Sequence, residues 1–69
     1  MAEHPPVVVH PLSPSGGRRV TAGAEILGLA YGPEDLLEFL RRAGLDPDQV
    51  RFDDRTLIEW LGGGPDVWA

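Results

Sequence analysis

One amphipathic helix, predicted from Gly32 to Leu45, constrains this chain most, because 69 residues leave few other ways to bury apolar surface. Pro33 suits the first helical position, because an N–H group at that position has no partner within the helix. Gly44 suits the left-handed position that ends a helix, which would bring Leu45 against Leu40. At about 100° per residue, one arc of this helix carries the apolar side chains, namely Leu36, Leu37, Phe39, Leu40 and Ala43. We expect that arc to face the core.

The charged side chains of the same stretch agree with this helix. Glu34 and Asp35 would lie in the first turn, where carboxylates interact favourably with the positive end of the helix dipole. Arg41 and Arg42 would lie in the last turn, where cations interact favourably with its negative end. Glu38 precedes Arg42 by four residues, the favoured orientation for an ion pair along a helix.

The length and composition predict one small domain over residues 1–69, with residues 1–5 and 63–69 flexible. A chain of this size is near the lower limit for folding alone, and it has no cysteine, hence no disulfide or thiolate zinc site. The fold must rely on packing, and self-association would add buried surface.

The charge pattern predicts a cytoplasmic protein without nucleic-acid or membrane partners. Six arginines against eleven acidic residues give a net charge of −5, whereas nucleic-acid binders gain most of their affinity from phosphate neutralisation. No apolar run approaches the roughly 18 residues of a membrane span. The N-terminus lacks the basic and apolar regions of a signal peptide.

Three strands are expected before the helix. The first, over 6–12, centres on the β-branched run at Val7 to Val9. After the loop 13–17, strands over 18–22 and 24–31 should form a hairpin with its turn at Gly23. Gly28, inside the third strand, predicts either a bulge or a close approach by the helix.

The segment from Thr56 to Leu61 follows the helix and fits two interpretations. It could form a short helix capped by Asp54 and ended by Gly62, or a strand rich in Thr, Ile and Trp. We take it as a strand, which predicts an α+β fold: a small antiparallel β-β-β-α-β sheet covered by one amphipathic helix. Trp68 could fold back onto the sheet and bury about 200 Å².

Several stretches resemble a group of small actinobacterial proteins that have no known activity. They are SPSGGRRVT, EILGLAY, DLLEFLRRAGL and IEWLGGG, which together cover most of the chain from about Val7 to Gly64. The resemblance implies a single small domain and an actinobacterial source. By size and strand order the chain is also similar to MbtH-like proteins, which assist adenylation enzymes, but it lacks their Ser-Leu-Trp-Pro stretch.

The stretch SPSGGRR is the best candidate ligand site. Backbone N–H groups around the two glycines could converge on an anion such as a phosphate, and the two arginines could close on it. The candidate residues are Ser15, Gly16, Gly17, Arg18 and Arg19. The full P-loop pattern is absent, so a plain turn between strands is the alternative interpretation.

No metal, cofactor or catalytic site is predicted. His4 and His10 with Glu3 match no metal-ligand spacing. The four aspartates between 46 and 54 lack the spacing of an EF-hand. A pair such as Glu25 and Glu59 could do acid–base work only if both lay on one face of the sheet. We therefore expect no enzyme.

The apolar character of both faces of the first and third strands predicts a homodimer. One helix covers one face of a sheet, and a large uncovered apolar patch is unusual on a soluble monomer. The second face could be covered by the C-terminal tail with Trp68 or by the same face of a second copy, and we expect the second copy. The expected interface residues are Val8, Leu27, Leu29, Tyr31 and Trp68. The chain is thus expected to be a cytoplasmic interaction or accessory protein. The alternatives are a module that binds anions through SPSGGRR and a nucleic-acid-associated regulator that gathers its six arginines on one face.

Overall fold

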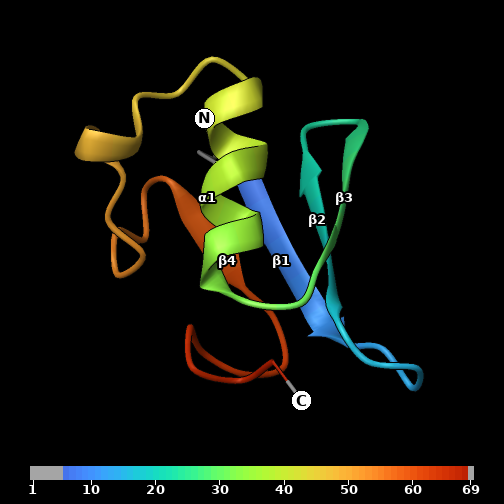
Figure 1. Cartoon of the computed structure of the whole chain (residues 1–69). Coiled ribbons are helices and arrows are strands. Elements are labelled where there is room, and N and C mark those ends of the chain that lie inside the picture. The colour runs from blue at the N-terminus through green and yellow to red at the C-terminus, as the bar shows by residue number, and fades with distance from the viewer. Residues whose placement is uncertain (1–5, 69) are drawn as a thin grey trace.

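The chain folds as four strands and one α-helix, so the predicted α+β class is confirmed. The computed structural model describes residues 6–68, and the predicted leader 1–5 lies outside them. In chain order the elements are β1 (Val7–Leu12), β2 (Arg18–Ala22), β3 (Glu25–Ala30), α1 (Pro33–Arg42), the short 3-10 helix η1 (Pro47–Gln49) and β4 (Ile58–Trp60) (Figure 1).

The sheet is mixed, which corrects the prediction of an antiparallel one. Its strand order is β3-β2-β1-β4. The strands β1, β2 and β3 pair antiparallel, whereas β4 runs parallel to β1, with Val7 opposite Ile58 and Val9 opposite Trp60. The chain leaves β3 at one edge, runs along α1 and returns at the other edge. A crossover of this kind is what joins parallel strands.

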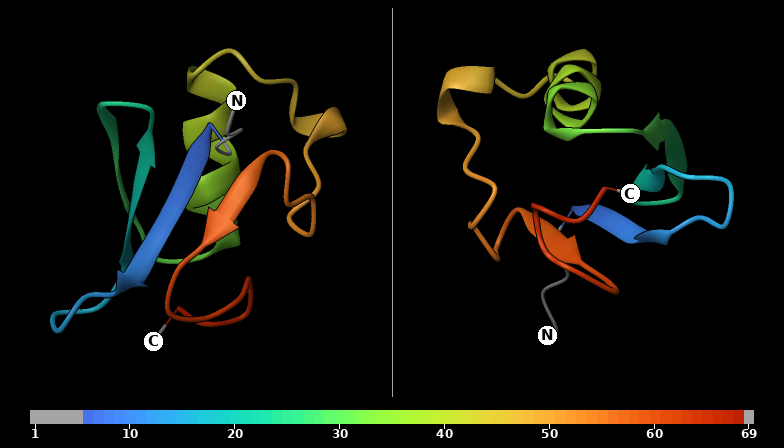
Figure 2. Two further views of the ribbon diagram at one scale, coloured as in Figure 1. Left: turned by 180° about the vertical axis from the view of Figure 1, so that it is seen from behind. Right: turned by 60° about the horizontal axis from the view of Figure 1, so that its bottom comes forward.

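The sheet and α1 form two layers (Figure 2), and the core lies between them. Alternation along β1 turns Val7 and Val9 toward the helix, and both are buried. Their neighbours in the core are Val20, Ala30, Leu36, Leu40 and Ile58. The predicted apolar arc of the helix therefore faces the sheet.

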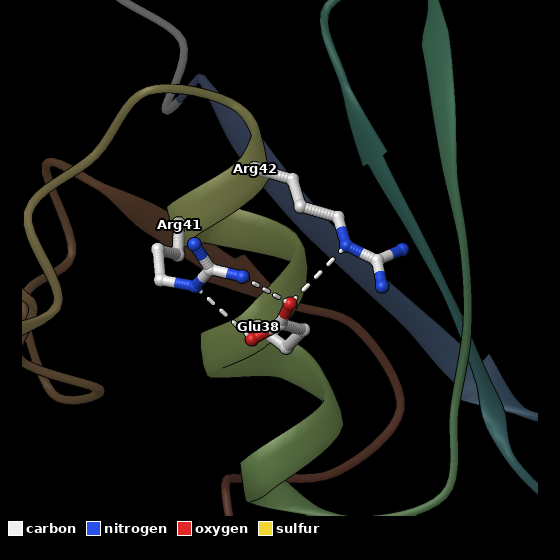
Figure 3. Close-up of polar contacts among 3 residues, drawn as sticks. All are labelled: Glu38, Arg41 and Arg42. Carbon is white, nitrogen blue, oxygen red and sulfur yellow. Dashed lines mark hydrogen bonds and ion pairs between the residues drawn. The ribbon is translucent and has the colours of Figure 1, made fainter.

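The helix ends as the sequence predicts. Gly44 has a φ of 100°, and its N–H donates to the carbonyl of Arg41 at 3.1 Å. The N–H of Leu45 donates to the carbonyl of Leu40 at 3.0 Å. These two bonds form a Schellman motif and satisfy carbonyls at the helix end. On the exposed side of α1, the carboxylate of Glu38 pairs with both Arg41 and Arg42 (Figure 3).

A bulge interrupts β3 before Gly28, so both predictions for this glycine are confirmed. Val20 lies opposite Gly28, but the next residue of β2, Thr21, lies opposite Ile26. Leu27 is thus the additional residue. A Cβ at Gly28 would lie 2.7 Å from the Phe39 ring, which shows how closely α1 approaches the strand.

The segment after η1 contains a strand rather than a second α-helix, and the strand is shorter than predicted. Asp54 accepts hydrogen bonds from the backbone N–H and the hydroxyl of Thr56 at 3.0 and 2.6 Å. These bonds lower the pKa of Asp54, the hydroxyl contributing most. They hold Thr56 in a turn, so β4 begins only at Ile58.

Beyond β4 the chain bends back on the side of the sheet that α1 covers, beneath the first turn of the helix (Figure 1). Trp68 packs against the core cluster and meets the Trp60 ring edge-on at a centroid distance of 6.0 Å. The sequence predicts that 63–69 is flexible, and the structure gives this segment a defined place as far as Trp68. Among residues 6–68 no helix has the length and apolar character needed to span a membrane.

Candidate interaction surface

The face of the sheet opposite α1 has no covering element in the described part of the chain. Strand alternation and register assign seven side chains to it, and we call it the open face. They are Val8, His10, Arg19, Thr21, Ile26, Leu29 and Glu59. A hydrogen bond of 3.0 Å between His10 Nε2 and Thr21 Oγ1 links β1 to β2 across this face.

The large apolar side chains that residues 6–68 expose all lie on the open face or at its rim. Ile26 and Leu29 are 64% and 37% exposed, and Tyr31 and Leu12 are 61% and 36% exposed. Tyr31 and Leu29 both lie beside Gly17, where a Cβ would be 2.9 and 3.0 Å from their side chains. The apolar surface is thus continuous around this glycine.

A hollow of about 310 Å³ lies at the end of the open face near the loop 13–17. His10, Leu12, Arg19 and Leu29 are among the residues that line it. An apolar hollow with a cation and an imidazole in its wall could receive one side chain of a protein partner.

Two opposite charges share the open face. Arg19 lies on β2 and Glu59 on β4, with β1 between them, and both are exposed. Neither has an ion-pair partner among the residues the structure describes. Both charges are therefore available to another molecule.

The structure divides the five predicted interface residues between the two sides of the sheet. Val8, Leu29 and Tyr31 lie on the open face or at its rim. Leu27 does not, because the bulge shifts the side-chain alternation of β3 by one residue and Leu27 packs against the core instead. Ile26, which the prediction omitted, takes its place.

Trp68 also lies on the other side of the sheet, where it packs against the core. The C-terminal segment therefore covers the same side as α1 and leaves the open face uncovered. The C-terminal segment contacts Arg18, which the sequence predicts to bind an anion.

Arg18 is buried in the core, so its predicted role as an anion ligand is not what the structure shows. It is 0% exposed, and burial lowers its pKa. Its Nε donates to the carbonyl of His10 at 2.9 Å. The other two nitrogens donate to the carbonyls of Leu61, Gly63, Gly64 and Val67 at 2.8 to 3.0 Å. These bonds use all five N–H groups of a guanidinium.

The remaining residues of SPSGGRR form a turn that bonds mainly to itself. The N–H of Gly16 donates to the carbonyl of Ser13 at 2.9 Å, and the N–H of Ser13 donates to the carbonyl of Gly17 at 2.8 Å. The N–H of Ser15 donates to the Ser13 hydroxyl at 3.3 Å. These three N–H groups point into the turn. Arg19 lies on the opposite face of β2 from Arg18, so the predicted residues do not converge on one anion.

The six arginines do not form one basic face. Arg18 is buried, Arg41 and Arg42 pair with Glu38, and Arg51 pairs with Asp53 at 3.4 Å. The two glutamates considered for acid–base work are also separated. Glu25 lies opposite Ala22 in β2, which places it on the α1 side at one sheet edge, whereas Glu59 lies on the open face at the other edge.

A second groove, of about 520 Å³, lies beside β4 and is lined by Phe52, Ile58, Trp60 and Pro65. Asp53, Arg55 and Glu59 line it as well, so its wall carries charges of both signs. Within residues 6–68 no three His, Asp or Glu side chains form a group that could hold a metal ion.

Comparisons with protein-family models, with curated proteins and with solved structures find no match for this chain. The resemblances to small actinobacterial proteins and to MbtH-like proteins therefore stay predictions. The function has to be inferred from the geometry.

Proposed function

We propose that this protein is a cytoplasmic interaction protein that binds through its open face, and that its first partner is a second copy of itself. One observation carries the proposal: the large apolar side chains exposed by residues 6–68 gather at the face that neither α1 nor the C-terminal segment covers. Large exposed apolar patches are unusual on soluble monomers and commonly mark interaction sites.

The charges of the open face favour a second copy as the partner. A two-fold axis brings the same surface of both copies together. Any contact between two different residues therefore forms twice across the interface. Arg19 of one copy can then face Glu59 of the other, and the reverse pair forms at the same time. Both charges lie on one face and have no ion-pair partner within the described part of the chain.

The size of the chain agrees with a dimer. An interface of standard size removes about 800 Å² from each partner, against a surface of 4682 Å² for this chain. That burial would add substantially to a core built around seven buried apolar residues. The alternatives have less support, because three N–H groups of SPSGGRR bond within its own turn and four of the six arginines are already bonded.

Light scattering after size exclusion at tens of micromolar tests the dimer. We expect a mass of twice 7.5 kDa for the parent chain. Ile26→Asp should yield the monomer mass, because it replaces the most exposed large apolar side chain of the open face with a carboxylate. Ala24→Asp is the matched control, since it adds the same charge two residues away in the exposed hairpin turn. A parent chain that stays at 7.5 kDa would refute self-association.

A charge exchange tests the two-fold pairing itself. Arg19→Glu should weaken the dimer, because two carboxylates would then face each other across the interface. Adding Glu59→Arg to the same chain should restore the dimer by reversing both charges. If the double variant dimerises no better than Arg19→Glu alone, these two residues do not meet.

A further inference from the structure

The C-terminal loop over 61–67 contacts the side chain of Arg18 through its backbone carbonyl groups. Four of the five carbonyls that Arg18 contacts belong to this loop, and the fifth belongs to His10 on β1. The residues that supply them lie 43 to 49 positions from Arg18 in the sequence. The loop is therefore held in place from a distant point of the chain.

The carbonyls match one chemical group in number and direction. A guanidinium has five N–H donors in a fixed planar arrangement, whereas an ammonium has three. Here five acceptors lie at hydrogen-bonding distance, one for Nε and two for each terminal nitrogen. An ammonium in the same place would leave at least two of these partly buried carbonyls without a donor, which is costly.

Two tryptophan rings complete the site. The guanidinium carbon of Arg18 lies 5.3 Å from the centroid of the Trp60 ring and 5.7 Å from that of the Trp68 ring. Both distances fall within the range of cation–π attraction. Among the hydrogen-bond partners of Arg18 in the described residues there is no carboxylate. The groups in direct contact with the charge are thus carbonyl dipoles and aromatic rings.

The glycines of the loop are needed for this closed form. Gly62 and Gly63 have φ values of 75° and 140°, a region that other residues rarely adopt. A Cβ at Gly62 would lie 2.8 Å from the Cβ of Pro11. The backbone is thus shaped to direct its carbonyls at the cation, which is a different role from that of a flexible linker.

We propose that the C-terminal loop, together with Trp60 and Trp68, is a guanidinium-binding site that closes only when a guanidinium occupies it. In this protein Arg18 supplies that group from within the same chain. The site lies on the α1 side of the sheet and does not depend on the open face.

Chemical rescue tests the proposal. Arg18→Ala removes Cγ, Cδ and the guanidinium, and ethylguanidinium replaces those atoms. We expect the variant to lose the parent fluorescence and indole N–H resonances of Trp60 and Trp68. Millimolar ethylguanidinium, far below denaturing concentrations, should restore them. Ethylammonium at equal ionic strength should not, and equal rescue by both cations would overturn the proposal.

Two further measurements keep the proposal testable if Arg18→Ala fails to fold. Arg18→Lys keeps the charge but has three donors, so the loop should stay open as judged by the same tryptophan signals. A closed loop in that variant would contradict a requirement for guanidinium. In the parent chain, the Nε–H of Arg18 should exchange with solvent far more slowly than that of Arg19. Comparable exchange rates would show that the site is not closed.

Discussion

Gly28 meets two constraints at one residue. Its φ of 151° is available to glycine and rarely to other residues. A Cβ in its place would also lie 2.7 to 3.1 Å from three carbon atoms of the Phe39 ring. The first constraint belongs to the bulge in β3, and the second belongs to the packing of α1 on the sheet.

We predict that Gly28→Ala lowers the free energy of unfolding by about 2–4 kcal/mol, the sum of backbone strain and overpacking. Gly23→Ala is the control, because Gly23 has a φ of 61° but no atom within 4 Å of the added Cβ. It should cost only the backbone strain, about 1–2 kcal/mol. Urea unfolding of both variants measures the difference, and equal losses would mean that Phe39 moves aside freely.

Arg18 and Arg19 show why the candidate site was only partly predictable at the residue scale. The sequence presents two adjacent arginines after two glycines, which suggests joint action on an anion. In a strand, neighbouring side chains point to opposite faces, so the predicted strand over 18–22 already argued against that interpretation. Four of the five carbonyls that bind Arg18 come from residues more than 40 positions away, and no local pattern indicates them.

The helix α1 completes the core by packing on one face of the sheet. Leu36 and Leu40 are both 0% exposed and lie one turn apart on the same face. The other face carries the ion pairs of Glu38 and stays in solvent. Packing and surface charge can therefore be tested separately in this one element.

We predict that Leu40→Ala costs about 2–5 kcal/mol, because it leaves a cavity under the helix. For a domain of this size such a loss is a large part of the total stability. Thermal or urea unfolding followed by circular dichroism measures it. Leu37→Ala, at a half-buried position of the same helix, should cost clearly less. Equal effects would mean that Leu40 is not central to the core.

We predict an acid-dependent contribution from Glu38. The hydrogen bond from Arg41 is the main cause that lowers the pKa of Glu38. A lowered pKa stabilises the fold above the ordinary glutamate value of about 4.3, and this contribution disappears as the pH falls through the lowered value. Glu38→Gln should therefore be less stable than the parent at neutral pH.

The difference between the two chains should vanish in strong acid, where the parent carboxylate is protonated as well. It should also shrink with added salt, because Glu38, Arg41 and Arg42 are all exposed. Urea unfolding at two pH values and two salt concentrations tests both statements. A difference that persists in acid would assign the effect to the side chain's shape rather than to its charge.

At the element scale, prediction succeeded where the signals were local. The caps and apolar arc of α1 lie within 14 consecutive residues, and the hairpin between β2 and β3 needs only one tight turn. Prediction found β4 as a strand but failed for its direction. Whether it runs parallel or antiparallel depends on the path of the whole crossover, and the bulge that displaces Leu27 depends on how β3 meets β2 and Phe39.

At the scale of the whole molecule, a homodimer predicts that stability depends on concentration. Association stabilises the folded state by mass action, so Tm should rise as the protein concentration increases. We expect this rise for the parent chain and its absence for Arg19→Glu, in which the proposed ion pairs are repulsive. Calorimetry over a hundredfold range of concentration measures both. A Tm that stays constant for the parent chain would argue against the dimer.

The parallel pairing of β1 with β4 also has a consequence for synthesis. The ribosome makes Val7, Val8 and Val9 long before their partners Ile58 to Trp60. Until then β1 has a neighbour on one side only, and its second edge presents unpaired backbone groups on a run of three valines. Such an edge is a template for pairing with another chain. The nascent protein therefore stays exposed to aggregation along this edge until β4 is complete.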